Sequence, residues 1–111
     1  MEVICKRKGR TLIATLSGEL DQHNAVYVRE EMDKQLGTAG IRNLIFDLSR
    51  LSFMDSSGLG IIIGRYKAVS ALGGQTRIAS PSEEAKRLIG LSGIHKIISV
   101  FDSVNTALED L

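Results

Sequence analysis

Two adjacent serines, Ser56 and Ser57, are the side chains of this chain best placed for chemistry. They follow the apolar run 44–48, which is typical of a buried strand, and precede segment 59–66, which is typical of the first turns of a helix. A loop that becomes a helix offers free backbone N–H groups and the positive end of the helix dipole. A hydroxyl held there is exposed, and a phosphate placed on it would find hydrogen-bond donors already directed at it.

Nucleophilic catalysis is the rival chemistry for these serines, and the sequence argues against it. A nucleophile elbow needs small residues two positions before and after the serine, in the pattern G-x-S-x-G, and neither Ser56 nor Ser57 has them. The general base would have to be His23 or His95, and a lone loop histidine such as His23 is more often a solvated or capping residue. We therefore do not expect an enzyme, and a small serine hydrolase remains only an alternative hypothesis.

No cofactor or metal site is expected. One cysteine and two distant histidines provide no ligand cluster with zinc spacing. Gly58, Gly60 and Gly64 do not form the G-x-G-x-x-G pattern of a dinucleotide-binding loop. These glycines allow two interpretations: close packing of a helix on a sheet, or a bare surface that a partner can approach.

Composition narrows the class of protein. A chain of 111 residues, 43% of them hydrophobic, suits one domain over residues 1–111 with a core that needs no metal or disulfide. The single cysteine cannot form an internal disulfide, and no apolar run approaches the ~20 residues that span a bilayer. The net charge of +1 argues against a general nucleic-acid binder, and the basic residues 6–10 are expected at an exposed hairpin tip. We expect a cytoplasmic protein that is monomeric when free.

The elements that position the serines alternate along the chain. In the first half we expect strands at 3–8 and 11–16 joined by a tight turn at Lys8-Gly9-Arg10, a loop at 17–21, an amphipathic helix at 24–36 with Asn24 as its N-cap, and a buried strand at 41–48. In the second half we expect a helix at 57–72, a strand at 75–79, a helix with Ser80 as its N-cap ending near 93, a strand at 96–101 and a closing helix at 103–111.

This order of elements, β-β-α-β-α-β-α-β-α, predicts an α/β fold. We expect a mostly parallel sheet that is opened by an antiparallel hairpin, with helices packed on it.

Residues 51–60, with the sequence LSFMDSSGLG, resemble the signature of the anti-sigma factor antagonists, which belong to the STAS domain superfamily. Segments 18–21, 64–67 and 91–98 are also similar to that family and occur in the right order. The resemblance covers essentially the whole chain and is strongest to the sporulation members.

The resemblance implies a single STAS-type domain with a regulatory role. Members of the family bind an anti-sigma factor that is also a serine kinase, and this binding frees the sigma factor. The kinase uses ATP to phosphorylate the serine that follows Asp in the motif, here Ser56, which ends the binding, and a serine phosphatase reverses the modification. A STAS module of a stress-sensing, stressosome-type assembly is the alternative role.

A partner-binding surface around Ser56 is also implied by the resemblance. Its expected members are Asp21, Met54, Asp55, Ser57, Gly58, Leu59 and Gly60. Structural alternatives remain open: Ser56 as an ordinary N-cap, Asp21 as an Asx turn or helix cap, and Leu59 as core. A phosphate adds about −1.5 to −2 charges, and we expect it to act at the interface without rearranging the fold.

Overall fold

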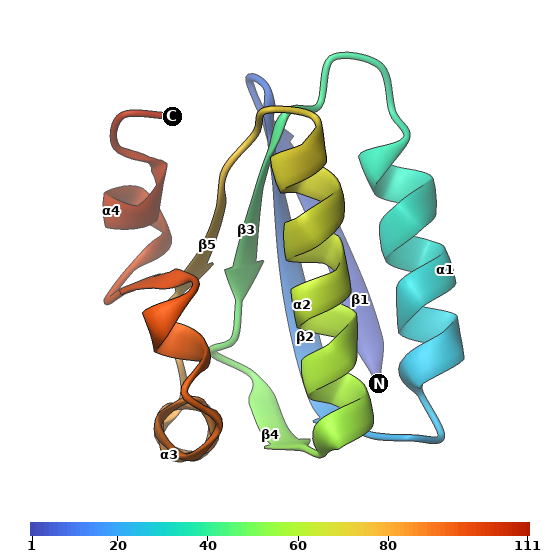
Figure 1. Ribbon diagram of the computed structural model, residues 1–111, viewed down its shortest axis with the longest axis vertical. Helices are drawn as coiled ribbons and strands as arrows, with labels where there is room; N and C mark the ends of the chain where they lie inside the picture. The colour runs from blue at the N-terminus through green and yellow to red at the C-terminus, as the bar shows by residue number, and fades with distance from the viewer.

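A six-stranded sheet with helices on both faces forms the protein, as seen in a computed structural model that describes residues 1–111 (Figure 1). The elements in chain order are β1 (Glu2–Lys8), β2 (Thr11–Leu20), α1 (Ala25–Leu36), β3 (Asn43–Asp47), β4 (Leu51–Met54), α2 (Ser56–Ala71), β5 (Thr76–Ala79), α3 (Glu83–Ser92), the 3-10 helix η1 (Ile94–Lys96), β6 (Ser99–Phe101) and α4 (Val104–Leu108). No helix is long and apolar enough to cross a membrane.

The strands are ordered β1-β2-β3-β5-β6, and β4 pairs separately with β2. β1 and β2 form the expected antiparallel hairpin, with Gly9 at a φ of +61° in its turn, and every other pair is parallel. The prediction of an α/β fold with a mostly parallel sheet opened by a hairpin is confirmed.

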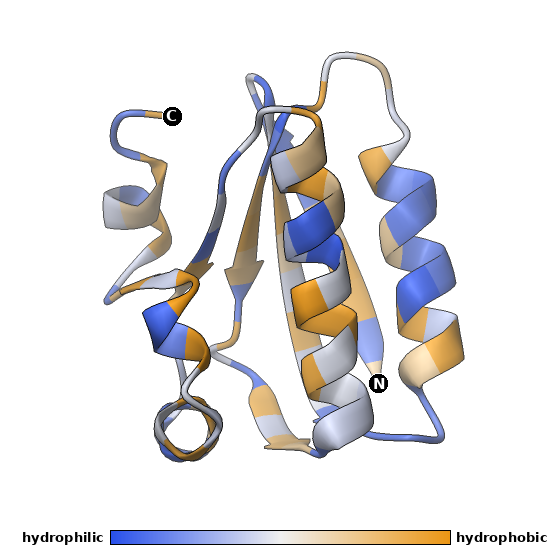
Figure 2. Ribbon diagram, viewed as in Figure 1, coloured by the Kyte–Doolittle hydropathy of each residue, from blue (hydrophilic) through white to orange (hydrophobic).

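The sheet separates two hydrophobic clusters, one on each of its faces. Leu44 and Phe46 of β3 belong to the main cluster, which lies beneath α1, α2 and α3, whereas Ile45 belongs to a small cluster beneath α4. Successive strand residues point to opposite faces, so β3 is covered on both sides, as its continuous apolar run predicts. Figure 2 shows hydrophobic residues along the strands behind α1 and α2, and hydrophilic residues over much of the outward side of α1.

The strand β4 was not predicted, and its pairing with β2 makes β2 longer than expected. After β3 the chain turns and returns as β4, which pairs with the far half of β2 in the register Gly18↔Leu51 and Leu20↔Met54. Because β4 supplies these backbone partners, β2 continues to Leu20 and the loop expected at 17–21 is wrong. The register shifts beside Gly18, whose φ of +108° favours glycine.

One of the two expected helix caps is wrong, and the other holds by position. Ser82, not Ser80, is the N-cap of α3: its Oγ accepts a hydrogen bond from the Ala85 N–H (3.1 Å) and donates one to the Leu51 carbonyl (2.7 Å). Asn24 is the N-cap of α1, as expected, but its side chain makes no cap bond and donates to the Glu19 carbonyl instead. The strand expected at 96–101 begins only at Ser99, because residues 94–96 form η1, and α4 ends at Leu108.

Replacement of Ser82 by alanine tests the cap assignment. The Ser82→Ala variant loses a helix cap and a bond to β4, so we expect it to be less stable by about 1–2 kcal/mol, measured as a lower Tm. Ser80→Gly is the control. Ser80 has a φ of +51°, which glycine adopts without strain, so this variant should be as stable as the parent or more so. A loss of stability in Ser80→Gly that equals the loss in Ser82→Ala would contradict the assignment.

Candidate functional site

The site around Ser56 is built where two parallel strands end side by side. β2 ends at Leu20 and β4 ends at Met54, and these two residues are paired in the sheet. The Asp55 N–H donates to the Leu20 carbonyl (3.3 Å), so the chain leaves β2 and β4 at the same edge of the sheet. The loop before α1 and the turn before α2 therefore lie next to each other, as expected for the carboxyl ends of parallel strands.

Asp55 holds these two segments together. One carboxylate oxygen, Oδ1, accepts from the Gly58 N–H (3.0 Å) and caps α2, and the other, Oδ2, accepts from the Gln22 N–H (3.1 Å) in the neighbouring loop. The hydrogen bond from Gly58 is the main reason that the pKa of Asp55 lies below its usual range, and the bond from Gln22 acts in the same direction. Asp55 is thus a structural carboxylate as well as an expected surface residue.

Ser56 is exposed and does not cap the helix. It is the first residue of α2, and the capping role considered for it belongs to Asp55. Ser57 follows and is half-buried. The hydroxyl of Ser56 therefore stands at the start of a 16-residue helix and is not needed for the helix to begin.

Asp21 lies in the adjoining loop and makes a local turn. Its Oδ1 accepts from both the backbone N–H (3.1 Å) and the side-chain amide (3.2 Å) of Asn24. Asp21 therefore has a structural role in the turn before α1, although its bond reaches three residues along the chain and not the two of an Asx turn. Because Gln22 contacts Asp55, the residue after Asp21 is tied to the turn that carries Ser56.

The glycines at the start of α2 have different surroundings. Gly58 is buried, and a Cβ there would overlap the Leu20 carbonyl oxygen and lie 2.8 Å from Met54 Cγ. The expectation that Gly58 admits a partner is wrong, because its bare face is already occupied by the end of β2. Gly60 is exposed and a Cβ there would meet nothing within 4 Å, so it does leave a bare surface.

Ser56 borders a shallow groove of about 270 Å³ between α2 and α3. Leu59, which is half-buried, lies along it, and Met54, only 5% exposed, forms part of its base. Residues of α3 complete it, among them Leu91, which is 74% exposed. The contribution of α3 was not expected, although segment 91–98 is among the motifs that indicate the family.

The serine hydrolase alternative has no support in this geometry. His23 and His95 are both exposed, and neither forms a hydrogen bond with Ser56 or Ser57. No group of three or more His, Cys, Asp or Glu side chains is arranged to hold a metal ion.

The dependence of thermal stability on pH should reveal the structural role of Asp55. A depressed pKa in the folded state means that the carboxylate stabilises the fold above its unfolded-state pKa of about 4, and that this stabilisation is lost as pH falls through the lower folded-state value. We expect Asp55→Asn to have a lower Tm than the parent at pH 7 and the two values to converge towards pH 3. Thermal unfolding across this range measures the effect. Asp102→Asn, at an exposed acidic position outside the site, is the control; a Tm gap for Asp55→Asn that stays constant with pH would contradict the prediction.

Comparison with known proteins agrees with this fold. The chain is 40% identical over 100 residues to an anti-sigma F factor antagonist of Paenibacillus polymyxa, covering 90% of this chain and 86% of the relative. It is also similar to the solved structure of the anti-sigma factor antagonist SpoIIAA in its unphosphorylated form, with a TM-score of 0.81, 27% identity, and coverage of 97% of this chain and 94% of the other. The phosphorylated form of Bacillus SpoIIAA matches with a TM-score of 0.73 and 27% identity, covering 97% of each chain.

A family model described as the STAS domain matches residues 2–107, nearly the whole of the described chain. The chain therefore belongs to the STAS domain family.

Proposed function

We propose that this protein is an anti-sigma factor antagonist and that phosphorylation of Ser56 switches it off. The observation that carries the proposal is the exposed Ser56 hydroxyl at the first position of α2, beside a shallow apolar groove and free of any capping role. The names of the relatives support the same function, and SpoIIAA, a structural neighbour, is described in both an unphosphorylated and a phosphorylated form.

The partner in this proposal is an anti-sigma factor that is also a serine kinase. The unphosphorylated chain binds the kinase and thereby releases the sigma factor. The kinase then transfers the γ-phosphoryl group of ATP to Ser56: a bond forms between Oγ and the phosphorus, the bond to the β-phosphate oxygen breaks, ADP leaves, and the hydroxyl proton is lost. A serine phosphatase hydrolyses the phosphoserine and restores the binding form. Such a cycle belongs to the cytoplasm, where sigma factors act.

The helix start can accept the new charge without refolding. Asp55 already caps α2 through the Gly58 N–H, so the phosphate does not have to replace a bond that holds the helix. The positive end of the helix dipole favours a negative group at this position. We therefore expect the phosphorylated domain to keep its fold.

Phosphorylation should weaken binding to the anti-sigma factor because Ser56 lies on the proposed partner surface. A phosphate at Ser56 would lie at the mouth of the groove and next to the Asp55 carboxylate, so a partner seated there would bury an unmatched charge. Burial of such a charge costs several kcal/mol. A loss of even ~3 kcal/mol weakens binding more than a hundredfold.

The remaining surface residues have narrower proposed roles. Gly60 provides a bare patch for close approach of the partner. Asp21, which also holds its own turn, presents a second carboxylate near Ser56 that could meet a basic group of the kinase. Ser57, Leu59 and Met54 complete the surface, and Gly58 is omitted from it because it is buried.

Phosphorylation of serine variants tests the acceptor. With the cognate anti-sigma kinase and Mg-ATP, we expect Ser56→Ala to bind the kinase but to gain no phosphate by mass spectrometry. Ser57→Ala is the matched control and should still be phosphorylated at Ser56. Phosphorylation of Ser56→Ala at the parent rate would show that another residue is the acceptor.

Replacement of Gly60 tests the binding surface. The space around Gly60 is open, so Gly60→Gln should leave the Tm nearly unchanged while weakening binding to the anti-sigma factor about tenfold or more, a loss of about 1.4 kcal/mol. Gly90→Gln is the control, because Gly90 is also exposed in a helix and has open space beyond it, but is not among the residues expected on the partner-binding surface. Calorimetry and thermal unfolding measure both properties. If Gly60→Gln and Gly90→Gln bind equally well, Gly60 is not part of the interface.

A further inference from the structure

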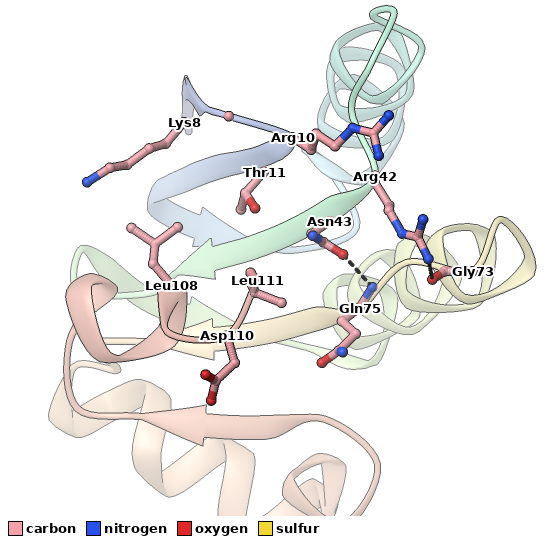
Figure 3. Close-up of a pocket in the computed structure, with 11 residues that line it drawn as sticks. Lys8, Arg10, Thr11, Arg42, Asn43, Gly73, Gln75, Leu108, Asp110 and Leu111 are labelled. Atoms are coloured by element: carbon pink, nitrogen blue, oxygen red, sulfur yellow. Dashed lines mark hydrogen bonds between the residues drawn. The ribbon is translucent and has the colours of Figure 1, made fainter.

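At the end of the sheet opposite Ser56, the chain forms a second and larger hollow of about 550 Å³ (Figure 3). It lies between the β1–β2 turn, the starts of β3 and β5, the segment that follows α2, and the end of α4 with the residues after it. The 16 residues of α2 correspond to a length of about 24 Å, so Ser56 at the helix start and this hollow beyond the helix end are well separated.

The charged side chains around this hollow are mostly cationic. Lys8, Arg10 and Arg42 line it, against a single acidic side chain, Asp110. None of these four residues forms an ion pair, because the ion pairs of the chain are Arg65–Asp33, Lys86–Glu83 and Arg87–Glu84. A chain whose net charge is only +1 thus gathers unpaired positive charge at one end.

Backbone bonds hold two of the cations on the same side. The Arg10 carbonyl accepts from the N–H groups of both Arg42 (2.8 Å) and Asn43 (3.0 Å), which fixes the hairpin turn against the start of β3. The Arg42 guanidinium is held further by its bond to the Gly73 carbonyl (3.0 Å). In Figure 3, the Lys8 side chain extends away from Arg10 and Arg42, and Asp110 lies apart from both arginines.

Polar groups make up most of the remaining lining. Thr11 and Asn43 lie between the cations, and the Asn43 Oδ1 accepts from the Gln75 N–H (2.9 Å), which fixes the side-chain amide in place (Figure 3). Only two of the eleven lining residues, Leu108 and Leu111, are hydrophobic. Such a lining does not favour an apolar ligand, and the volume is within the range of small-molecule sites.

We propose that this hollow binds a small polar molecule that carries a multiply charged oxyanion, either phosphate or carboxylate. Guanidinium groups recognise both through paired N–H donors, and two arginines without ion pairs on one side of the hollow favour an anion with more than one charge. The polar groups between the cations would hold the rest of the molecule. Since the hollow is distant from Ser56, such a ligand and an anti-sigma factor can be bound at the same time, and the proposal does not depend on the phosphorylation switch.

Titration of the whole chain, followed by its backbone amide NMR signals, tests this site. The probes are inorganic pyrophosphate and tricarballylate, each compared with sodium chloride at the same ionic strength. We expect saturable shifts at Gly9, Thr11, Asn43 and Gln75. Saturation by pyrophosphate alone identifies a phosphate ligand, saturation by tricarballylate alone identifies a carboxylate ligand, and saturation by both supports the shared chemistry.

Three variants separate a built site from general charge attraction. Arg10→Gln removes a cation whose side chain makes no hydrogen bond in the chain, and should weaken binding about fivefold, as expected for one charge contact near the surface. Asp110→Asn removes the opposing carboxylate and should tighten binding; asparagine tolerates the φ of +67° at this position, so the fold is preserved. Lys67→Gln, at an exposed cation on α2 outside the hollow, should leave the affinity unchanged.

The proposal is overturned by any of three results. The first is the absence of saturable shifts at the hollow with either probe. The second is a set of shifts confined to residues 56–60, which would indicate that the start of α2 is the anion site. The third is an equal loss of affinity in Arg10→Gln and Lys67→Gln, which would indicate attraction to net charge alone.

Discussion

The carboxylate of Asp55 is the interaction on which the proposed binding surface depends. Its two oxygens bind N–H groups from two segments that are 33 and 3 residues away along the chain, at Gln22 and Gly58. One bond starts α2 and the other fixes the loop before α1, so a single side chain sets the position of Ser56 relative to Asp21. Because the carboxylate serves as the cap, Ser56 is left with no structural task. A residue that is modified reversibly benefits from this separation, since adding or removing a phosphate does not disturb the bonds that hold the helix.

The short strand β4 makes this arrangement possible. β3 ends at Asp47, and without a second partner the far half of β2 would leave its backbone groups unpaired. β4 takes over the pairing from Gly18 to Leu20 and delivers Asp55 to the end of β2. The buried face of Gly58 then packs directly on the Leu20 carbonyl, which any larger side chain would displace. The hydrogen bond from Ser82 to the Leu51 carbonyl ties α3 to the same strand, and α3 supplies the outer wall of the groove.

Local patterns predicted much of this fold, and long-range contacts explain most of what they missed. The hairpin, the buried β3 and the amphipathic α1 follow from apolar periodicity and turn residues, which are local properties. β4 was missed because four residues with two exposed side chains resemble a loop until their partner strand is known. Likewise, Ser80 and Ser82 are both plausible caps by sequence, and the Leu51 carbonyl, 31 residues from Ser82, is one of the contacts that distinguish them.

The same reasoning applies to the site. That Asp21 and Asp55 share one surface was expected from the family resemblance alone. The physical reason appears only with β4: the two residues follow paired strands whose carboxyl ends lie at one edge of the sheet. The difference between Gly58 and Gly60 was not expected. Residues two positions apart on a helix differ by a rotation of about 200° about the helix axis, so one glycine faces the sheet and the other faces outward. Which one does so depends on the helix's rotation about its own axis, which is set by the Asp55 cap and by the contact of Gly58 with the end of β2. A motif can therefore identify a surface while the fold decides which of its residues a partner can reach.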